Sequence, residues 1–152
     1  MSSSNDQDVK ILNGLIETTI DSADGYAEAA QDAESTRFSA TFQSRATERR
    51  HVANVLQQQV RTLGGKPDDE GSVLASAHRV FVNLRKSISA GDTAVVDEVE
   101  RGEDHIKAKF ESALKDQDVS SGIRALITDA YASVKAGHDQ MRDLKHAMHN
   151  QP

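Results

Sequence analysis

Prolines are almost absent from this 152-residue chain, and their scarcity constrains its fold more than any other feature. The only two are Pro67 and the terminal Pro152. A proline inside a helix removes a backbone hydrogen bond and clashes with the preceding turn, so helices tend to end near it. Long helices can therefore form both before Pro67 and between Pro67 and Pro152. We expect an all-α fold.

Hydrophobic residues recur every three to four positions in four segments, which is the spacing of amphipathic helices. The first segment covers about 8–33. The second can be capped by Ser35 or Thr36, and Gly64-Gly65 closes it because glycine tolerates the left-handed backbone that ends many helices. The turn-rich segment 64–71 that follows should carry a crossover between two antiparallel hairpins.

The second half of the chain contains the other two periodic segments. The third is interrupted at Ser89–Asp92, where Asp92 resembles a new helix cap. We therefore predict 73–115 as one helix kinked near Gly91 or as two helices in series. The last segment follows Asp118 and continues to His149. The prediction is a single four-helix bundle domain over 9–149, preceded by a disordered polar tail over 1–8.

The charge balance excludes several classes of partner. The chain has 24 Asp and Glu against 18 Lys and Arg, a net charge of −6 and a pI near 5.5. Nucleic acids and anionic membranes require a concentrated excess of basic residues, so we expect neither as a partner. The first residues lack the pattern of a signal peptide, and cysteine is absent, which fits a reducing compartment. We expect a cytoplasmic protein.

Small residues line one face of the first segment, next to its apolar stripe. They are Gly14, Thr18, Ser22, Gly25 and Ala29. Two glycines in a helix cost helix propensity, so a row of this kind indicates close approach of another helix. That helix can belong to the same bundle or to a second copy of the chain, which would make this face a homo-oligomer contact.

A Glu-x-x-His pair, Glu48 and His51, is the clearest candidate for chemistry. Residues at i and i+3 project to one side of a helix and can share a metal ion. Glu17 lies 31 positions before Glu48 (48 − 17), a gap that lets an antiparallel hairpin bring the two side by side. The third segment offers Glu100 and Glu103 as further carboxylates.

Several runs of residues resemble a bacterial four-helix-bundle family, DUF2383, which is grouped with ferritin-like proteins and has no established activity. The runs are Leu12–Tyr26, Arg49–Val52, Gly64–Pro67, Ala77–Arg79 and Glu98–Asp104, and the resemblance spans about residues 9 to 115. It implies a ferritin-like bundle of two hairpins. Our leading expectation is a non-catalytic bundle that acts through self-association or a partner, with a link to stress response by analogy to ferritin-like relatives.

The wider ferritin-like group holds two iron ions between a Glu, a Glu-x-x-His, another Glu and another Glu-x-x-His on successive helices. By resemblance, Glu17, Glu48 and His51 would form the first half of such a site, and Glu103 would join them, for iron or another divalent metal. The second half lacks a counterpart, since Asp143-x-x-His146 lies 40 residues past Glu103 (143 − 103) and on the outer face of its helix. A di-iron oxidase or iron-handling protein is therefore the alternative function, and no catalytic residue is assigned.

The angular positions of the polar residues around their helices favour a structural role over metal binding. At about 100° per residue, Glu48 and His51 lie roughly 70° and 130° from the centre of their apolar stripe, whereas Glu103 points inward. Arg45 and Arg49 lie on the stripe itself. A guanidinium in a core needs a carboxylate partner, which Glu17, Glu34 or Glu103 can supply. The sequence thus also predicts structural ion pairs at Arg45 and Arg49, while His138 borders the apolar face of the last segment as a core histidine.

Overall fold

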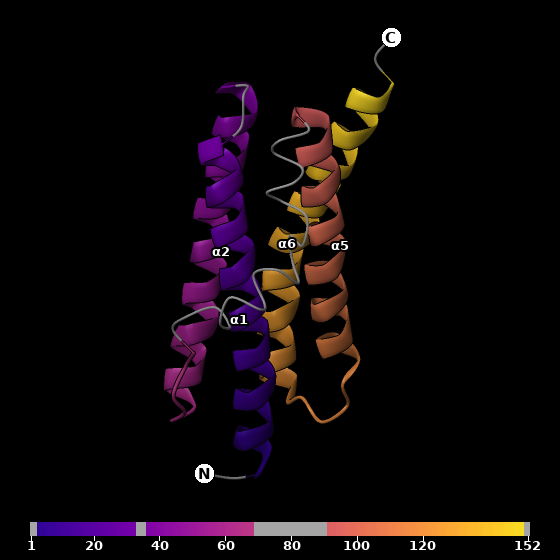
Figure 1. Cartoon of the computed structure of the whole chain (residues 1–152). Helices are drawn as coiled ribbons and strands as arrows, with labels where there is room; N and C mark the ends of the chain where they lie inside the picture. The colour runs from indigo at the N-terminus through magenta and orange to yellow at the C-terminus, as the bar shows by residue number, and fades with distance from the viewer. Residues whose placement is uncertain (1–2, 33–35, 69–90, 151–152) are drawn as a thin grey trace.

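The computed structural model describes residues 3–32, 36–68 and 91–150, and four helices contain most of them (Figure 1). They are α1 (Ser3–Asp32), α2 (Thr36–Thr62), α5 (Asp92–Lys115) and α6 (Ser121–His149). Helices α1 and α6 run in one direction, and α2 and α5 run in the other. α1 packs on α2 and α5, and α6 packs on α5 and α2, so every neighbour is antiparallel. The fold is the expected all-α four-helix bundle, with one crossover from α2 to α5.

Helix α2 ends as its two glycines predict. Gly64 adopts a φ of 83°, a left-handed conformation that suits glycine, and the Gly65 N–H donates to the Val60 carbonyl at 3.0 Å. Asn13 of α1 then holds the segment that follows. Its amide donates to the carbonyl of Lys66 at 3.1 Å and accepts the N–H of Asp68 at 2.9 Å. The start of the crossover is thereby fixed to α1.

The predicted disordered tail over 1–8 is wrong for the residues that the structure describes there. Helix α1 begins at Ser3, and the side chain of Asp8 is buried. The Asp8 carboxylate accepts the N–H of Ser120, the residue that precedes α6, at 3.1 Å. Acidic residues also favour a helix N-terminus electrostatically. The polar composition of these residues predicts a tail. The sequence does not reveal the contact that holds Asp8, because its partner lies 112 residues away.

Helix α5 begins at Asp92, with Gly91 as the capping residue at a φ of 108°, one position before the expected cap. Whether another helix precedes it concerns residues outside the described ranges. At its other end, Arg124 of α6 donates to the carbonyls of Leu114 and Asp116, the latter at 2.7 Å. These bonds satisfy carbonyls at the end of α5 and tie it to α6.

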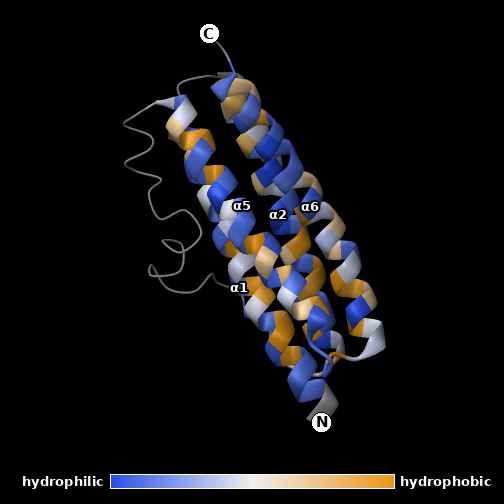
Figure 2. Ribbon diagram, turned by 90° about the vertical axis from the view of Figure 1, so that its right-hand side faces the viewer, coloured by the Kyte–Doolittle hydropathy of each residue, from blue (hydrophilic) through white to orange (hydrophobic). Residues whose placement is uncertain are grey.

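The core consists of two hydrophobic clusters along the bundle axis, and hydrophobic residues follow the seams between helices (Figure 2). One cluster extends from Leu12 to Val134 in the sequence and includes Ile16, Leu56, Ile106 and Phe110. The other contains Tyr26, Phe42, Val99 and Met141. Between them, each helix contributes one residue to what we call the polar layer: Ser22, Arg49, Glu103 and Gly137. Among the described residues, no helix has the length and apolar character needed to cross a membrane.

Candidate functional site

An ion pair between α2 and α5 occupies the middle of the bundle. Arg49 Nη1 and Nη2 donate to the two carboxylate oxygens of Glu103, each at 2.6 Å, and both side chains are fully buried. Nη1 also donates to Ser22 Oγ at 2.8 Å, and Nη2 donates to the Val134 carbonyl at 3.3 Å. Paired parallel bonds are the strongest geometry for a guanidinium and a carboxylate. One side chain therefore bonds to all three other helices.

Gly137 of α6 provides the space that this pair occupies. A Cβ atom at this position would lie 2.4 Å from Arg49 Nη2 and 3.0 Å from Glu103 Oε2, closer than real contacts allow. A glycine inside a helix usually costs about 1 kcal/mol relative to alanine. Here the missing side chain lets α6 approach the guanidinium closely enough for the bond to Val134.

The surroundings of Arg49 favour its charged form. Burial by itself would lower the pKa of Arg49, but the charge and hydrogen bonds of Glu103 raise it above its ordinary value. The Tyr26 ring lies beside the guanidinium, with Arg49 Cζ 5.6 Å from the ring centre. Burial and then the charge of Glu103 raise the pKa of Tyr26 well above its usual range. Arg49 is therefore a buried cation with a neutral phenol beside it.

The four ligands suggested from the sequence do not converge. Glu103 is bonded to Arg49, and Glu48 accepts hydrogen bonds from Arg45 at 2.5 Å and from Ser133 at 2.8 Å. His51 is exposed, and Glu17 is half-buried. Among the described residues, no three of these four place ligand atoms within 4.8 Å of one another. A core metal centre built from them is therefore not what the structure contains.

The second predicted arginine lies nearer the surface than the first. The side chain of Arg45 is 14% exposed, and it pairs with Glu48 within α2. It also donates from Nε and Nη2 to Gln140 Oε1 of α6, at 3.1 and 2.7 Å. Arg45 thus joins α2 to α6 at the edge of the polar layer, whereas Arg49 joins all four helices inside it.

The small-residue face of α1 is mostly inside the bundle. Thr18, Ser22, Gly25 and Ala29 are buried, and only Gly14 is exposed. Ser22 belongs to the polar layer, and Thr18 donates to the carbonyl of Gly14 at 3.1 Å. Four of the five small residues therefore serve close packing within one chain, and a homo-oligomer contact through this face stays a prediction.

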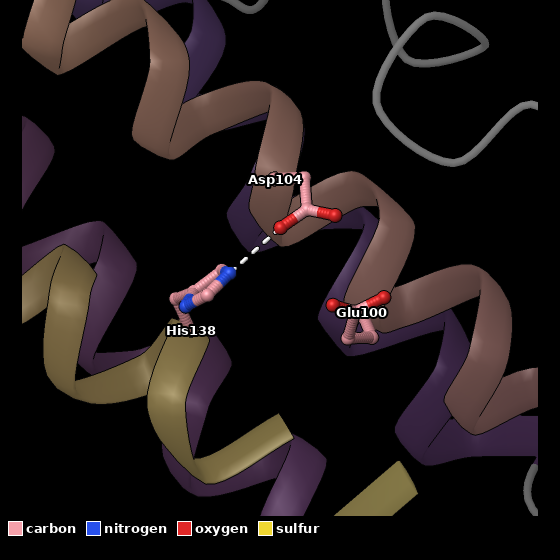
Figure 3. A group of neighbouring side chains, drawn as sticks. All are labelled: Glu100, Asp104 and His138. Carbon is pink, nitrogen blue, oxygen red and sulfur yellow. Dashed lines mark hydrogen bonds and ion pairs between the residues drawn. The ribbon is translucent and has the colours of Figure 1, made fainter. Parts of the chain in front are cut away.

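A different set of possible ligands converges between α5 and α6. Glu100 and Asp104 of α5 and His138 of α6 each place one ligand atom within 4.8 Å of the others (Figure 3). Residues four apart lie on one face of a helix, so both carboxylates are directed toward the same side of α5. His138 Nε2 lies 2.7 Å from Asp104 Oδ1. We call Glu100, Asp104 and His138 the outer site.

Burial differs across the outer site. The His138 side chain is 10% exposed and that of Glu100 is 13% exposed, whereas Asp104 is 58% exposed. The imidazole and one carboxylate are therefore held within the protein while the other carboxylate faces water. The Asp104 side of the outer site is therefore the side in contact with solvent.

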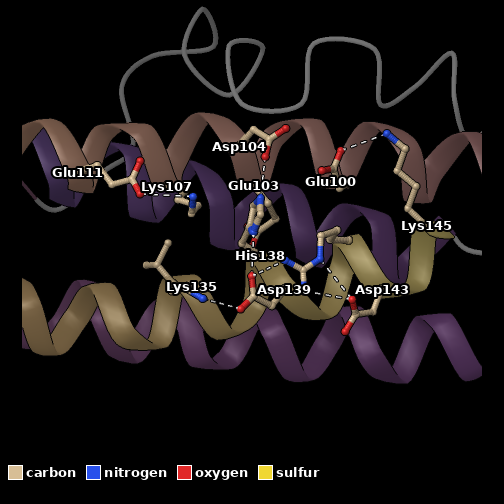
Figure 4. Close-up of polar contacts among 12 residues, drawn as sticks. Glu100, Glu103, Asp104, Lys107, Glu111, Lys135, His138, Asp139, Asp143 and Lys145 are labelled. Atoms are coloured by element: carbon tan, nitrogen blue, oxygen red, sulfur yellow. Dashed lines mark hydrogen bonds and ion pairs between the residues drawn. The ribbon is translucent and has the colours of Figure 1, made fainter. Parts of the chain in front are cut away.

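Charged residues of α6 surround the outer site (Figure 4). Asp139 Oδ1 lies 3.2 Å from His138 Nδ1, and Lys145 Nζ lies 3.3 Å from Glu100 Oε2. Lys135 bonds to Asp139 at 2.8 Å, and this bond, followed by the contact with His138, lowers the pKa of Asp139 to about 2. Metal-binding histidines usually hold a carboxylate at their other ring nitrogen, which orients the ring. Asp139 occupies that position.

The sequence predicts the outer site only in part. Glu100 is recognisable as a carboxylate of the third segment and His138 as a residue at the edge of an apolar face, but no motif connects them. Asp104 lies on the solvent side of α5, and although it ends the run Glu98–Asp104, it belongs to no metal-binding motif. The spacing of Glu100 and Asp104 at i and i+4 was the available signal, and this spacing is common on exposed helices.

The geometry above defines the protein as a four-helix bundle with a charged central layer and a small ligand cluster at its rim. The family model described as a domain of unknown function, DUF2383, matches residues 7–116, which is 110 of 152 residues (116 − 7 + 1). The chain belongs to this family, as its sequence resemblance indicated. No curated protein matches it.

Proposed function

We propose that this protein binds one divalent transition-metal ion at the outer site and acts as a metal-binding bundle rather than as an enzyme. The observation that carries the proposal is the convergence of Glu100, Asp104 and His138 from two helices, with Asp139 behind the histidine ring. Two carboxylate oxygens and one imidazole nitrogen are a ligand set suited to Zn²⁺, Fe²⁺ or Mn²⁺.

The distances require only a small adjustment. Ligand atoms around one ion with bonds of about 2.1 Å lie about 3.4 Å apart. Those of the outer site lie within 4.8 Å of one another. For all three to bind one ion, Asp104 Oδ1 and His138 Nε2, which lie 2.7 Å apart, would move slightly apart, and the Glu100 side chain would rotate away from Lys145. Water would complete the coordination, since Asp104 faces solvent.

The exposure of Asp104 supports a binding role over catalysis. Catalytic metal sites gain strength from a water-excluded, low-dielectric surrounding, which a ligand that is 58% exposed does not provide. The proposal also differs from a di-iron centre, because the core position holds Arg49 and Glu103 instead of two ions. Membership of the wider ferritin-like group remains part of this proposal, supported by the single crossover between hairpins.

Self-association and a link to stress were the other functions expected from the sequence. Self-association rested on the small-residue face of α1, four of whose five members are buried. The link to stress rested on family analogy alone. Metal binding therefore takes precedence, because its residues come together in the structure.

Titration of the metal-free protein with Zn²⁺ in a calorimeter tests the proposal, and Co²⁺ serves as a coloured substitute that reports geometry. We expect one ion per chain and a loss of affinity of at least 10-fold in His138→Gln. His149→Gln is the matched control, because His149 contacts Asp97 at 2.7 Å across the same two helices and no third ligand joins them within the described part of the chain. Equal affinity in both variants, or no binding by the unaltered protein, would refute the proposal.

A further inference from the structure

We infer that Arg49 is a positioning residue for the outer site, which it supports from beneath without contacting any ion. This inference rests on the proposed function. Its basis is that the Arg49 guanidinium hydrogen-bonds to both helices that form the outer site. It bonds to Glu103 of α5 and to the backbone carbonyl of Val134 of α6.

The bonded residues are close neighbours of the ligands in sequence. Glu103 directly precedes Asp104, so a fixed inward direction for one sets the outward direction of the other. Val134 lies about one helical turn before His138, since the two positions are four apart in the sequence. The guanidinium therefore fixes the rotation of α5 about its own axis and the position of α6 along the bundle axis, close to where the ligands meet.

The backbone of α6 is also held close at this level. Gly137, the residue before His138, leaves the space into which Arg49 extends. Ligands are productive when held within about 0.5 Å of their bonding positions, and they depend on supporting residues for this. Surface contacts such as the pair of Lys145 and Glu100 are released when an ion binds, so they cannot supply that support.

Arg49 could instead act only through overall stability, and the two roles predict different results. Arg49→Met leaves Glu103 buried without a cation and should both destabilise the fold and weaken metal binding. The double variant Arg49→Met/Glu103→Leu removes both charges, and such replacements often restore stability. If Arg49 positions the ligands, the double variant regains its melting temperature but still binds Zn²⁺ at least 10-fold more weakly.

The experiment compares the Zn²⁺ affinity and the visible spectrum of bound Co²⁺ in the unaltered protein and the double variant, at a temperature where both are folded. Arg50→Met is the control, since Arg50 pairs with Asp24 on the surface and contacts neither α5 nor α6 in the described contacts. Unchanged affinity and spectrum in the double variant would overturn the inference while leaving the proposed function intact. If the double variant does not fold, Arg49→Lys replaces it, because a lysine keeps the charge but cannot bond to Glu103 and Val134 together. Failure of the unaltered protein to bind Zn²⁺ would instead remove the proposed function.

Discussion

On α5 and α6 the polar layer and the outer site occupy adjacent residues, Glu103 beside Asp104 and Gly137 beside His138, yet the two regions differ in almost every physical respect. Arg49 and Glu103 are fully buried and bonded to each other through two hydrogen bonds. Asp104 and His138 are joined by one contact, with Asp104 facing water. A buried pair cannot release its partner without leaving an unpaired charge, whereas a rim pair can exchange its partner for an ion. The side of the helix on which a residue lies therefore separates residues that specify the fold from residues that are available for binding.

The largest expected effect tests the buried half of this comparison. Arg49→Met should lower the free energy of unfolding by about 3–5 kcal/mol, because Glu103 stays in the core without a cation. Urea denaturation followed by circular dichroism measures the loss. Arg50→Met, at an exposed pair, should cost less than about 1 kcal/mol. Similar losses of unfolding free energy in the two variants would mean that the buried pair contributes no more to stability than the exposed pair.

Metal addition tests the exposed half. With free Zn²⁺ at about 100 times its dissociation constant, the folded state should gain about 2.7 kcal/mol, which appears as a higher melting temperature. A loss of affinity of at least 10-fold should reduce the gain to about 1.4 kcal/mol or less in His138→Gln, whereas the full gain should persist in His149→Gln. An equal rise in all three proteins would indicate binding elsewhere on the surface.

A substitution next to both regions should have an intermediate effect. Gly137→Ala places a methyl group 2.4 Å from Arg49 Nη2 and should destabilise the protein by about 1–3 kcal/mol through overpacking. Gly14→Ala is the control, because no atom lies within 4 Å of a Cβ at that position. The control should be neutral or stabilising by up to about 1 kcal/mol, since alanine favours the helix. A Gly137→Ala protein as stable as Gly14→Ala would contradict the described packing.

The smallest effect concerns pH at the rim. The pKa of Asp139 is lowered to about 2 in the folded protein, below its ordinary value of 3.8. A lowered folded pKa means that the carboxylate stabilises the fold above pH 3.8 and that this contribution is lost as the pH falls toward 2. Asp139→Asn should therefore be slightly less stable than the unaltered protein at pH 6, with the difference vanishing near pH 2. A difference that stays constant over this range would show that Asp139 acts through packing.

The sequence allowed the inner region to be predicted better than the outer one, for a physical reason. Arg49 and Glu103 occupy positions on apolar stripes, and a charge on such a stripe must find an opposite charge in the core. Periodicity alone therefore pointed to both residues. The predicted ligand pair of Glu48 and His51 did not indicate a core site. Residues at i and i+3 share one side of a helix, but that side need not face the core.

The outer site depends on quantities that periodicity does not contain. Asp104 and His138 meet because α5 and α6 have a particular rotation and height relative to each other, and these follow from the loop over 116–120, from Arg124 and from the polar layer. A one-turn error in that height would move His138 about 5.4 Å from its position. Only the three-dimensional structure shows that Asp104 and His138 lie next to each other.

The polar layer between the two hydrophobic clusters has a consequence for protein engineering. Apolar stripes repeat every turn, so hydrophobic packing alone would accept several vertical offsets between helices with similar energies. Sliding α2 by one turn, however, would place Arg49 among hydrophobic side chains and leave its charge unneutralised. A redesign that replaces the pair with Met and Leu is expected to gain thermal resistance, but it would also permit offset packings that the natural chain rejects.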